Sequence, residues 1–385
     1  MKRLGWSIVV VFLVIGLLPV GAAGAAPEVP AKSSVLMDVA TGTLLYESNA
    51  HEPLAPASVT KVMTMLLIME AIDSGAIGWN DPVTASEAAA AKGGSQIFLK
   101  VGETMSVADM VKSIAVSSAN DCACAMAEHI AGSEAAFVEL MNSRAQELGM
   151  KDTHFVNCTG LDDSEEAKKH RTSAHDIALM SRQLLGNHPE IKKFTTIWMD
   201  SVRDGAFGLS NTDKLVRFYD GATGLKTGFT SGAGYCLSAS AMREGMELIA
   251  VVMGAETSKE RFNTCKSLLD HGFANYALIQ PDLTETGSVP VKLGKASQVT
   301  PRLGQQPCLL IDKAQKSTVT TQVQLEAELT APVSQGQRLG TLTVRSGEQI
   351  LKEIPLVAAE GVERLRFGDL FLLALKKAAM AKPSS

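Results

Sequence analysis

Ser58 and Lys61 are the residues whose types and spacing most directly suggest covalent chemistry. They stand three positions apart where an apolar stretch, residues 62–72, begins, and positions i and i+3 share a helix face. A serine hydroxyl attacks well only when a nearby base removes its proton, and lysine is such a base only when neutral. Burial and a second cation nearby would disfavour the charged amine. The pair is therefore a candidate nucleophile and general base, with helix-start N–H groups available to an oxyanion.

Two further groups strengthen this interpretation, because Ser-x-x-Lys alone arises by chance in most chains of this size. Ser118 and Asn120 lie in a serine-rich break between helical stretches and offer a hydroxyl and an amide for proton relay and substrate binding. Lys226, Thr227 and Gly228 stand just before an apolar strand. All three groups in this order are much rarer than any one, so we predict one active site. Strand alternation would send Lys226 and Thr227 to opposite faces, and how both reach one ligand stays open.

Other kinds of site have little support in the sequence. No His-Glu-x-x-His spacing, no Gly-x-Ser-x-Gly elbow and no phosphate-binding glycine loop occurs, so we expect neither a metal nor a cofactor. The six cysteines are scattered through a large chain, which predicts mostly buried free thiols instead of a disulfide scaffold or a zinc site. A net charge of -5 without a long basic run argues against nucleic acid as a partner.

The elements that must position these residues are typical of one α/β domain. Turn residues 38–42 between two short apolar runs predict a β-hairpin. Residues 62–72 predict a buried helix, and residues 81–185 have the alanine-rich texture of a mostly helical insertion. Two strands and a closing helix are expected at residues 234–241, 247–253 and 261–273. Strands at both ends with helices between them indicate an α/β fold.

A chain of 385 residues with 46% apolar composition should hold more than one domain. Towards the C-terminus the pattern changes to alternating strands. Residues 319–329 predict a half-buried strand, and residues 342–344 with 350–357 predict a hairpin. We therefore expect a catalytic domain at residues 27–276 and a small all-β domain at residues 280–358.

Both ends of the sequence suggest export and membrane attachment. Residues 1–26 combine two basic residues, an apolar run shorter than the ~20 residues needed to cross a bilayer, and an Ala-x-Ala pattern. They predict a cleaved signal peptide, with an uncleaved anchor as the alternative. Residues 361–382 place apolar and charged side chains on opposite sides of a helix, which predicts an amphipathic anchor on the outer face of the cytoplasmic membrane. Packing of this helix on the β-domain is the alternative.

The three groups resemble the active-site set of penicillin-binding proteins and serine β-lactamases. The surrounding sequence is most similar to the low-molecular-mass D-alanyl-D-alanine carboxypeptidases, serine peptidase family S11. The stretches that carry this similarity are residues 56–64, 118–121, 148–155, 224–230 and 261–263. The resemblance implies a transpeptidase-like α/β catalytic domain, an antiparallel sheet with helices and an α-rich insertion. A small all-β domain and a C-terminal amphipathic helix would follow it.

Carried over by position, the resemblance implies that Ser58 is acylated by the penultimate D-alanine carbonyl of a peptidoglycan stem pentapeptide. Lys61 would be its general base, and Ser118 would relay the proton to the leaving D-alanine. Asn120 would hold the stem peptide. The backbone N–H groups of Ser58 and Phe229 would form the oxyanion hole.

The resemblance places the substrate carboxylate at Lys226 and Thr227, beside Gly228. Arg261 would attract the same carboxylate, and an exposed arginine at a helix start is the alternative. Phe229 departs from the family pattern, in which a polar residue or histidine is common. This departure leaves the backbone N–H intact but puts the substrate preference in doubt.

Three functions are compatible with these residues. The first is a serine D-alanyl-D-alanine carboxypeptidase that β-lactam antibiotics acylate as inhibitors. The second is a β-lactamase, which needs fast deacylation by an activated water, and residues 139–142 match such a pattern only superficially. The third is a catalytically silent wall-binding protein, against which the intact motif residues argue. We predict the first.

Overall fold

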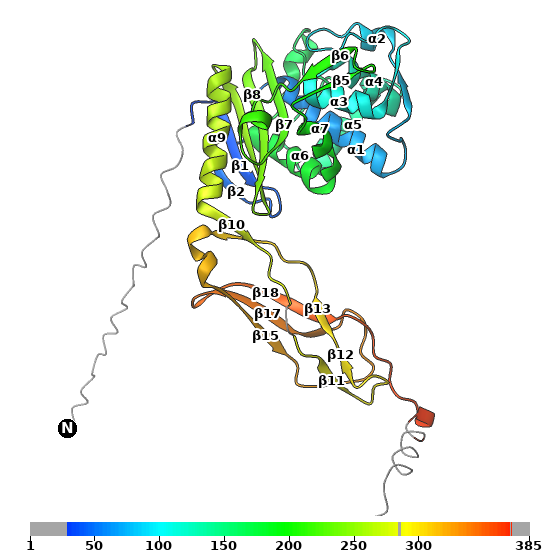
Figure 1. Cartoon of the computed structure of the whole chain (residues 1–385), viewed down its shortest axis with the longest axis vertical. Helices are drawn as coiled ribbons and strands as arrows, with labels where there is room; N and C mark the ends of the chain where they lie inside the picture. Colours follow the sequence, from blue (N-terminus) through cyan, green and yellow to red (C-terminus); the bar gives the residue numbers. More distant parts are fainter. Residues whose placement is uncertain (1–28, 284–285, 370, 372–385) are drawn as a thin grey trace, which may run out of the picture.

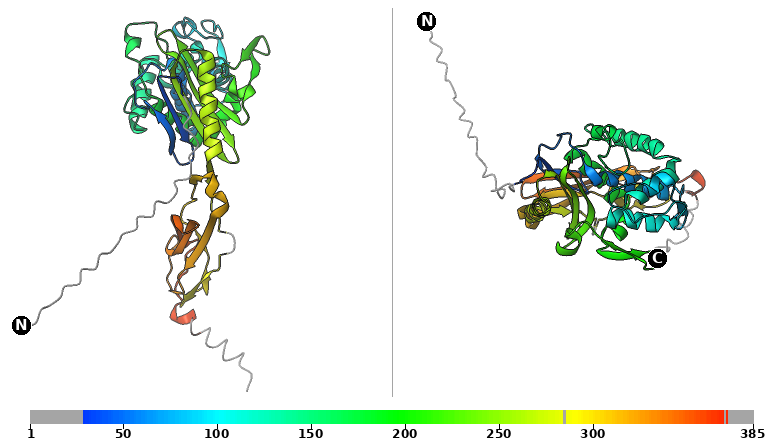
Figure 2. Two further views of the ribbon diagram at one scale, coloured as in Figure 1. Left: turned by 90° about the vertical axis from the view of Figure 1, so that its left-hand side faces the viewer. Right: turned by 90° about the horizontal axis from the view of Figure 1, so that it is seen from above.

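The computed structural model describes residues 29–283, 286–369 and 371. The predicted signal peptide and most of the predicted C-terminal helix lie outside these residues. The described chain forms a larger unit of helices and strands, followed end to end by a slender unit of strands (Figure 1). A quarter turn shows the same arrangement, with helix α9 (Ser258–Asn275) along one side of the larger unit (Figure 2). The predicted fold class is confirmed.

A five-stranded antiparallel sheet forms the centre of the larger unit. Its strands, in spatial order, are β2 (Leu44–Ser48), β1 (Ser33–Asp38), β9 (Met246–Ala255), β8 (Gly234–Arg243) and β7 (Ala222–Thr230). The predicted N-terminal hairpin is β1–β2, and it pairs with β9, the last strand of the sheet along the chain. The chain therefore leaves the sheet after β2 and returns at β7, an edge strand that packs against the helical part.

Strand residues alternate between two cores, one on each face of this sheet. On β9, Ile249 and Val251 belong to the core shared with the helical insertion, whereas Leu248, Ala250 and Val252 belong to the core beneath α9. This alternation is the period-two geometry of a strand. Because both faces are covered, every residue of β9 is buried, which explains its apolar run from Leu248 to Met253.

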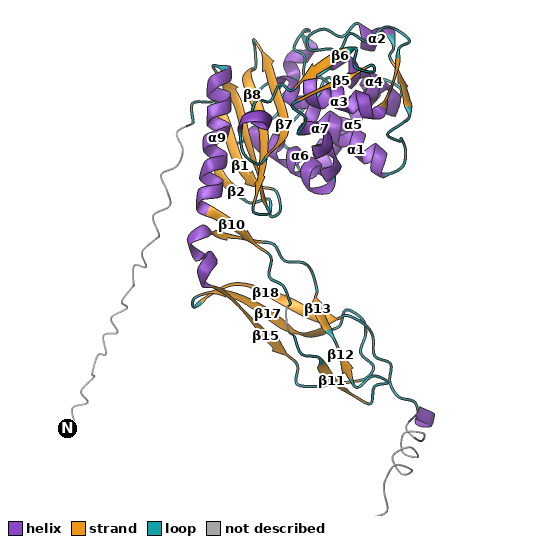
Figure 3. Cartoon of the chain, viewed as in Figure 1, coloured by secondary structure: helices purple, strands orange, loops and turns teal. Residues whose placement is uncertain are grey.

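Helices cover both faces of the sheet (Figure 3). On one face, α9 begins with a capping box between Thr257 and Glu260. It packs closely because Gly272 has no Cβ, which would lie 2.4 Å from Leu248 Cδ1. The insertion helices are α1 (Lys61–Asp73), α2 (Glu87–Ala90), α3 (Val107–Ser117), α4 (Asn120–Ala131), α5 (Glu134–Glu147), α6 (Ala174–Asn187) and α7 (Lys192–Thr195), and α8 (Leu215–Phe218) precedes β7.

Two short antiparallel strand pairs interrupt the helical part, and the first lies within the residues predicted as mostly helical. They are β3 (Pro82–Thr84) with β4 (Thr104–Ser106), and β5 (Met199–Val202) with β6 (Phe207–Ser210). Strands of three or four residues are too short for periodicity to reveal them.

The all-β unit contains sheets of two, three and four strands. They are β10 (Tyr276–Ile279) with β14 (Leu309–Asp312); β12 (Gln298–Val299), β11 (Val289–Lys292) and β16 (Leu329–Thr330); and β13 (Pro301–Leu303), β18 (Gln349–Ala358), β17 (Arg338–Ser346) and β15 (Val319–Leu325). The predicted hairpin is β17–β18, whose inward residues Leu342, Val344, Ile354 and Leu356 form a core.

The strand predicted at residues 319–329 is wrong in length and in burial. β15 ends at Leu325, and Leu329 belongs to a separate strand that pairs in parallel with β11. β15 occupies an edge of the four-stranded sheet, and Val323 on its apolar side is 40% exposed. Alternation indicated a strand correctly, but it does not show whether another layer covers the apolar face.

The described part of the C-terminal segment leaves apolar side chains uncovered. Phe367 is 84% exposed and Phe371 is 58% exposed. Across residues 29–283, 286–369 and 371, no helix combines the length and the apolar character needed to cross a bilayer. The prediction of an interfacial anchor concerns residues that lie mostly beyond this range and stays a prediction.

Candidate active site

Ser58 lies in a 3-10 turn, η1 (Ala57–Thr60), directly before α1 begins at Lys61. It is thus one short turn ahead of the α-helix, yet the i, i+3 relationship still brings the two side chains together. Lys61 Nζ lies 3.0 Å from Ser58 Oγ and donates a second hydrogen bond, 2.8 Å long, to Thr159 O. Ser58 is partly exposed, whereas Lys61 is fully buried. Ser58 is therefore accessible to a substrate, whereas Lys61, its candidate base, is shielded from solvent.

Burial lowers the pKa of Lys61 to about 7, although Cys158 and Asp121 act in the opposite direction. A base with a pKa near the working pH is the most effective proton acceptor, so the environment suits general-base catalysis. The second cation expected nearby is Lys226. Burial, Lys61 and Arg261 together hold the pKa of Lys226 well below its usual value.

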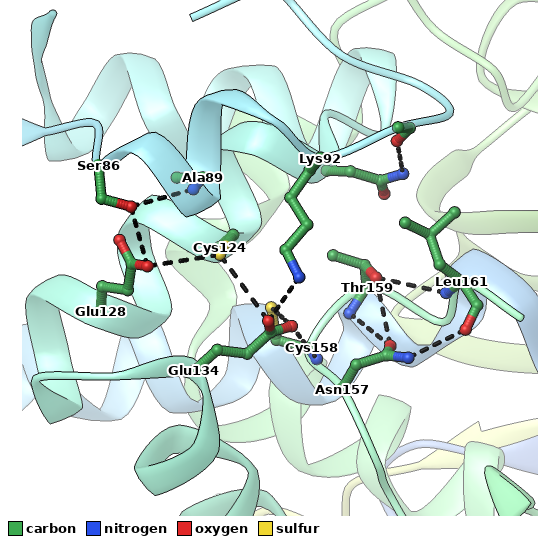
Figure 4. A network of polar contacts seen from close by, with 12 residues as sticks. Ser86, Ala89, Lys92, Cys124, Glu128, Glu134, Asn157, Cys158, Thr159 and Leu161 are labelled. Atoms are coloured by element: carbon green, nitrogen blue, oxygen red, sulfur yellow. Dashed lines mark hydrogen bonds and ion pairs between the residues drawn. The ribbon is translucent and has the colours of Figure 1, made fainter. Parts of the chain in front are cut away.

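A loop between α5 and α6 holds the Thr159 carbonyl against Lys61. Figure 4 shows how Asn157 lies between Thr159 and Leu161 in this loop. Asn157 Oδ1 accepts hydrogen bonds from Thr159 N at 3.2 Å, Thr159 Oγ1 at 3.2 Å and Gly160 N at 2.7 Å. Asn157 Nδ2 donates to Leu161 O at 2.9 Å. One asparagine side chain therefore organises the loop that places the lysine.

A half-buried carboxylate and amine, together with two buried thiols, back this loop (Figure 4). Glu134 Oε1 accepts hydrogen bonds from the N–H and from the Sγ of Cys158, both at 3.2 Å, and Lys92 Nζ donates to Glu134 Oε2 at 2.5 Å. The neighbouring Cys124 is the largest cause that raises the pKa of Cys158 well above its usual value, so Cys158 is a neutral thiol. All six cysteines are unpaired, and five of them are buried.

His170 supports the nucleophile turn from another segment. Its Nδ1 accepts a hydrogen bond from Val156 N at 3.2 Å, so Nε2 carries the ring proton and donates it to Thr60 Oγ1 at 2.9 Å. Thr60 Oγ1 in turn donates to Ala57 O at 2.8 Å. Burial lowers the pKa of His170 to about 3. The ring is therefore neutral, and its two hydrogen bonds connect Val156 to Thr60.

Ser118 and Asn120 lie where the sequence predicted them, in the break between α3 and α4. Ser118 has a left-handed backbone, φ +62. Ser118 Oγ and Asn120 Oδ1 are buried without a hydrogen-bond partner among the described residues, which leaves both able to bond a substrate. Asn120 Nδ2 donates to Gly93 O at 2.7 Å.

Lys226, Thr227 and Gly228 occupy the edge strand β7. Lys226 is buried, and its Nζ donates to Thr227 O at 2.9 Å, so the long lysine side chain returns to its own strand. Thr227 Oγ1 donates to Thr212 Oγ1 at 2.7 Å. A Cβ at Gly228 would lie 2.7 Å from Pro56 O. The missing side chain therefore lets β7 touch the nucleophile turn.

Arg261 and Phe229 flank the end of this strand. Arg261 is only 6% exposed and donates to Gly228 O at 3.0 Å and to Cys236 O at 3.2 Å. The alternative of an exposed arginine at the helix start is therefore wrong, because the guanidinium reaches from α9 onto two strand carbonyls. Phe229 is 54% exposed and stacks on Tyr235, with ring centroids 4.3 Å apart.

Several residues of the site were not found from the sequence. Asn157, Thr159 and Gly160 form a polar turn that ends in glycine, a pattern that indicates a turn but not which side chain it faces. His170 stands alone in the sequence, with no motif around it. Only the three-dimensional contacts reveal the position of these residues.

Comparison with known proteins agrees with this geometry. The family described as D-alanyl-D-alanine carboxypeptidase matches residues 21–257, and the penicillin-binding protein 5 C-terminal domain matches residues 274–364. The protein belongs to the D-alanyl-D-alanine carboxypeptidase family. The resemblance seen in the sequence and the enzyme class that it implied are confirmed.

Individual carboxypeptidase relatives extend over most of the chain. The chain is 44% identical to D-alanyl-D-alanine carboxypeptidase DacF of Bacillus subtilis over 344 residues, which is 88% of this chain and 87% of the relative. Penicillin binding protein 5 from Haemophilus influenzae has a similar structure, with a TM-score of 0.74 and 32% identity over 89% of this chain and all of the other. A D2 penicillin-binding protein from Listeria monocytogenes, solved in its ampicillin-bound form, matches 65% of this chain and all of the other at 32% identity, with a TM-score of 0.56.

Proposed function

We propose that this carboxypeptidase removes the terminal D-alanine from peptidoglycan stem pentapeptides through an acyl-enzyme on Ser58. The observation that carries the proposal is the contact of Ser58 Oγ with a buried Lys61 amine, 3.0 Å away, whose pKa is lowered to about 7. Family membership supports the reaction class. No metal or cofactor takes part in the proposed steps.

In the first step the neutral Lys61 amine takes the proton of Ser58 as Oγ attacks the carbonyl carbon of the penultimate D-alanine. The hydrogen bond from Lys61 to Thr159 O fixes the amine, so that its lone pair can be directed at the hydroxyl. The peptide C–N bond then breaks, and the leaving amine takes a proton through Ser118, whose Oγ is unpartnered among the described residues. Water later cleaves the ester, which releases the tetrapeptide and restores Ser58.

The substrate needs two further contacts. Asn120 Oδ1, buried and unpartnered in the described chain, can accept an N–H of the stem peptide. The terminal carboxylate is placed at Lys226 and Thr227 on β7, which lies directly against the nucleophile turn. Arg261 contributes to binding of the carboxylate in two ways. It holds Gly228 O by a hydrogen bond, and its positive charge attracts the carboxylate. We assign the oxyanion to the N–H groups of Ser58 and Phe229.

Labelling with a fluorescent penicillin tests the acyl-enzyme. We expect a long-lived adduct that Ser58→Ala abolishes and that Ser74→Ala, at an exposed serine after α1, leaves unchanged. Rapid turnover of the penicillin would indicate the β-lactamase alternative, and no labelling of the wild type would indicate a silent wall-binding protein.

Release of D-alanine tests the substrate. A pentapeptide that ends in D-Ala-D-Ala should lose one D-alanine, whereas the matching tetrapeptide should lose none. Equal release from both peptides, or release that survives in Ser58→Ala, would contradict the proposed reaction.

We also propose that the enzyme is exported and attached to the outer face of the cytoplasmic membrane. The support is the pattern of residues 1–26, the amphipathic spacing of residues 361–382 and the 84% exposure of Phe367. Fractionation without detergent, with and without residues 361–385, tests the anchor. The truncated form should leave the membrane fraction, and retention of both forms there would show that the anchor lies elsewhere.

A further inference from the structure

Asp162 is an exposed carboxylate in the loop that follows Gly160, close to the nucleophile turn. The loop is fixed directly before it, because Asn157 Nδ2 donates to the carbonyl of Leu161 at 2.9 Å (Figure 4). A Cβ added to Gly232, in the turn between β7 and β8, would lie 3.2 Å from Asp162 Oδ2. The Asp162 side chain therefore reaches from this loop to the end of the edge strand.

No cation of the described chain neutralises Asp162. Glu165 and Glu166, in the same loop, each form an ion pair with a lysine three residues further on, whereas Asp162 forms none among the described residues. The turn that Asp162 faces, residues 230–234, reads Thr-Ser-Gly-Ala-Gly and offers no positive charge. The carboxylate is thus free to pair with a cation from outside the chain.

The contact between Asp162 and Gly232 lies at one end of the active site. The Gly160 loop and the strand β7 both touch the turn that carries Ser58, the strand through Gly228. Beyond Ser58 the loop and the strand meet again, at Asp162 and Gly232. The site is therefore bounded by Asp162 on the side where β7 ends.

The proposed binding mode gives the substrate a direction along β7. The terminal carboxylate is placed at Thr227 and the oxyanion at the N–H of Phe229, two residues further along the strand. The part of the peptide that precedes the scissile bond then continues in the same direction, towards residues 230–234, if it lies extended along the strand edge. Asp162 stands at the end of this path.

Asn120 gives an independent placement of the same side of the site. It is only 1% exposed, and its Oδ1 has no hydrogen-bond partner in the part of the chain that the structure describes. A Cβ added to Gly94 would lie 2.8 Å from Asn120 Nδ2 and 3.3 Å from Leu161 Cδ2. Asn120, which is assigned to the stem peptide, and the residue before Asp162 therefore flank one glycine.

We propose that Asp162 binds the free side-chain amine of the stem-peptide residue that precedes the two D-alanines, a diamino acid such as lysine. The inference rests on the proposed carboxypeptidase function. The site then has opposite charges at its two ends, Arg261 near the terminal carboxylate and Asp162 near the amine, and both match the charges of such a peptide. Asp162 makes the enzyme select stems whose amine is unmodified, because acylation of the amine removes its charge.

Two pentapeptides that end in D-Ala-D-Ala and differ only at the third residue, lysine or Nε-acetyllysine, test this selection. The wild-type kcat/KM for D-alanine release should be about two- to fivefold higher for the lysine peptide at low salt, the range expected for an exposed ion pair. The preference should shrink as salt is added. Asp162→Asn should have a ratio of about one. Asp163→Asn, which removes the same charge one residue further along the loop, should keep the wild-type ratio.

Charge reversal provides a second test that a merely damaged loop would fail. The wild type should use a peptide with glutamate at the third position less well than one with glutamine, whereas Asp162→Lys should prefer the glutamate peptide. Equal use of the lysine and acetyllysine peptides by the wild type, or a preference that survives in Asp162→Asn, would overturn the inference. Wild-type enzyme that releases D-alanine from no peptide would instead overturn the proposed function.

Discussion

A Cβ atom added to Gly160 would lie 1.8 Å from the carbonyl oxygen of Ala57. The turn that carries Ser58 and the loop that holds Thr159 O therefore touch backbone to backbone. Both residues have left-handed backbones, with φ +82 at Gly160 and +48 at Ala57, a region that residues with a Cβ rarely adopt. The position of the Lys61 amine thus depends on a contact that only glycine permits.

Gly160→Ala should disrupt both the fold and the chemistry. The inserted methyl group must push two backbones apart. Together, this overpacking and the left-handed φ should lower the free energy of unfolding by at least about 3 kcal/mol. Gly132→Ala is the matched control, because it shares a φ of +80 but has no atom within 4 Å of the added Cβ. In urea unfolding, the control should lose only about 1 kcal/mol of its free energy of unfolding. Equal losses for both variants would contradict the contact.

Asn157→Ala should slow acylation more than it destabilises the enzyme. The substitution leaves the N–H groups of Thr159 and Gly160 without their acceptor and frees the carbonyl that holds Lys61. We expect a roughly 10- to 100-fold slower reaction with fluorescent penicillin, since misplacement by about 1 Å can have such an effect. Asn142→Ala, which breaks paired hydrogen bonds to Phe155, should lower stability yet spare acylation of the folded protein.

The acylation rate should follow the protonation of Lys61. Because only the neutral amine can take the proton of Ser58, the rate should rise about tenfold per pH unit below about pH 7 and level off above it. Lys61→Arg should abolish acylation at every pH, since a guanidinium does not lose its proton in proteins. The exposed Lys151→Arg should keep the wild-type profile. A wild-type rate that is flat from about pH 5 to 8 would argue against Lys61 as the base.

His170 should make the protein less stable in mild acid. Its pKa is about 3 in the folded protein and near 6.5 when unfolded, so the unfolded chain alone binds the proton between these values. The free energy of unfolding should fall by up to about 1.4 kcal/mol per pH unit as the pH drops below about 6.5, with no effect above it. His170→Gln should lose this part of the pH dependence. His129→Gln, at an exposed position in α4, should retain it.

Much of the fold was visible in local patterns. The hairpin β1–β2, the buried helix α1 and the strands β8 and β9 follow from turn residues and periodicity, which depend on neighbours in the chain. β15 shows the limit of such patterns, because its alternation is real but Val323, in the middle of its apolar side, is 40% exposed. Burial depends on what lies opposite a strand, and that segment can come from anywhere in the chain.

The sequence by itself determined the chemistry, since Ser58 and Lys61 are three residues apart and any helix or turn brings them together. Ser118, Asn120 and Lys226 could be proposed as partners from their order and type. Only the tertiary structure decided what makes the lysine a base. Thr159 O and the neutral His170 reach the site from distant segments, and the dry environment that shifts a pKa exists only once those segments have packed around it.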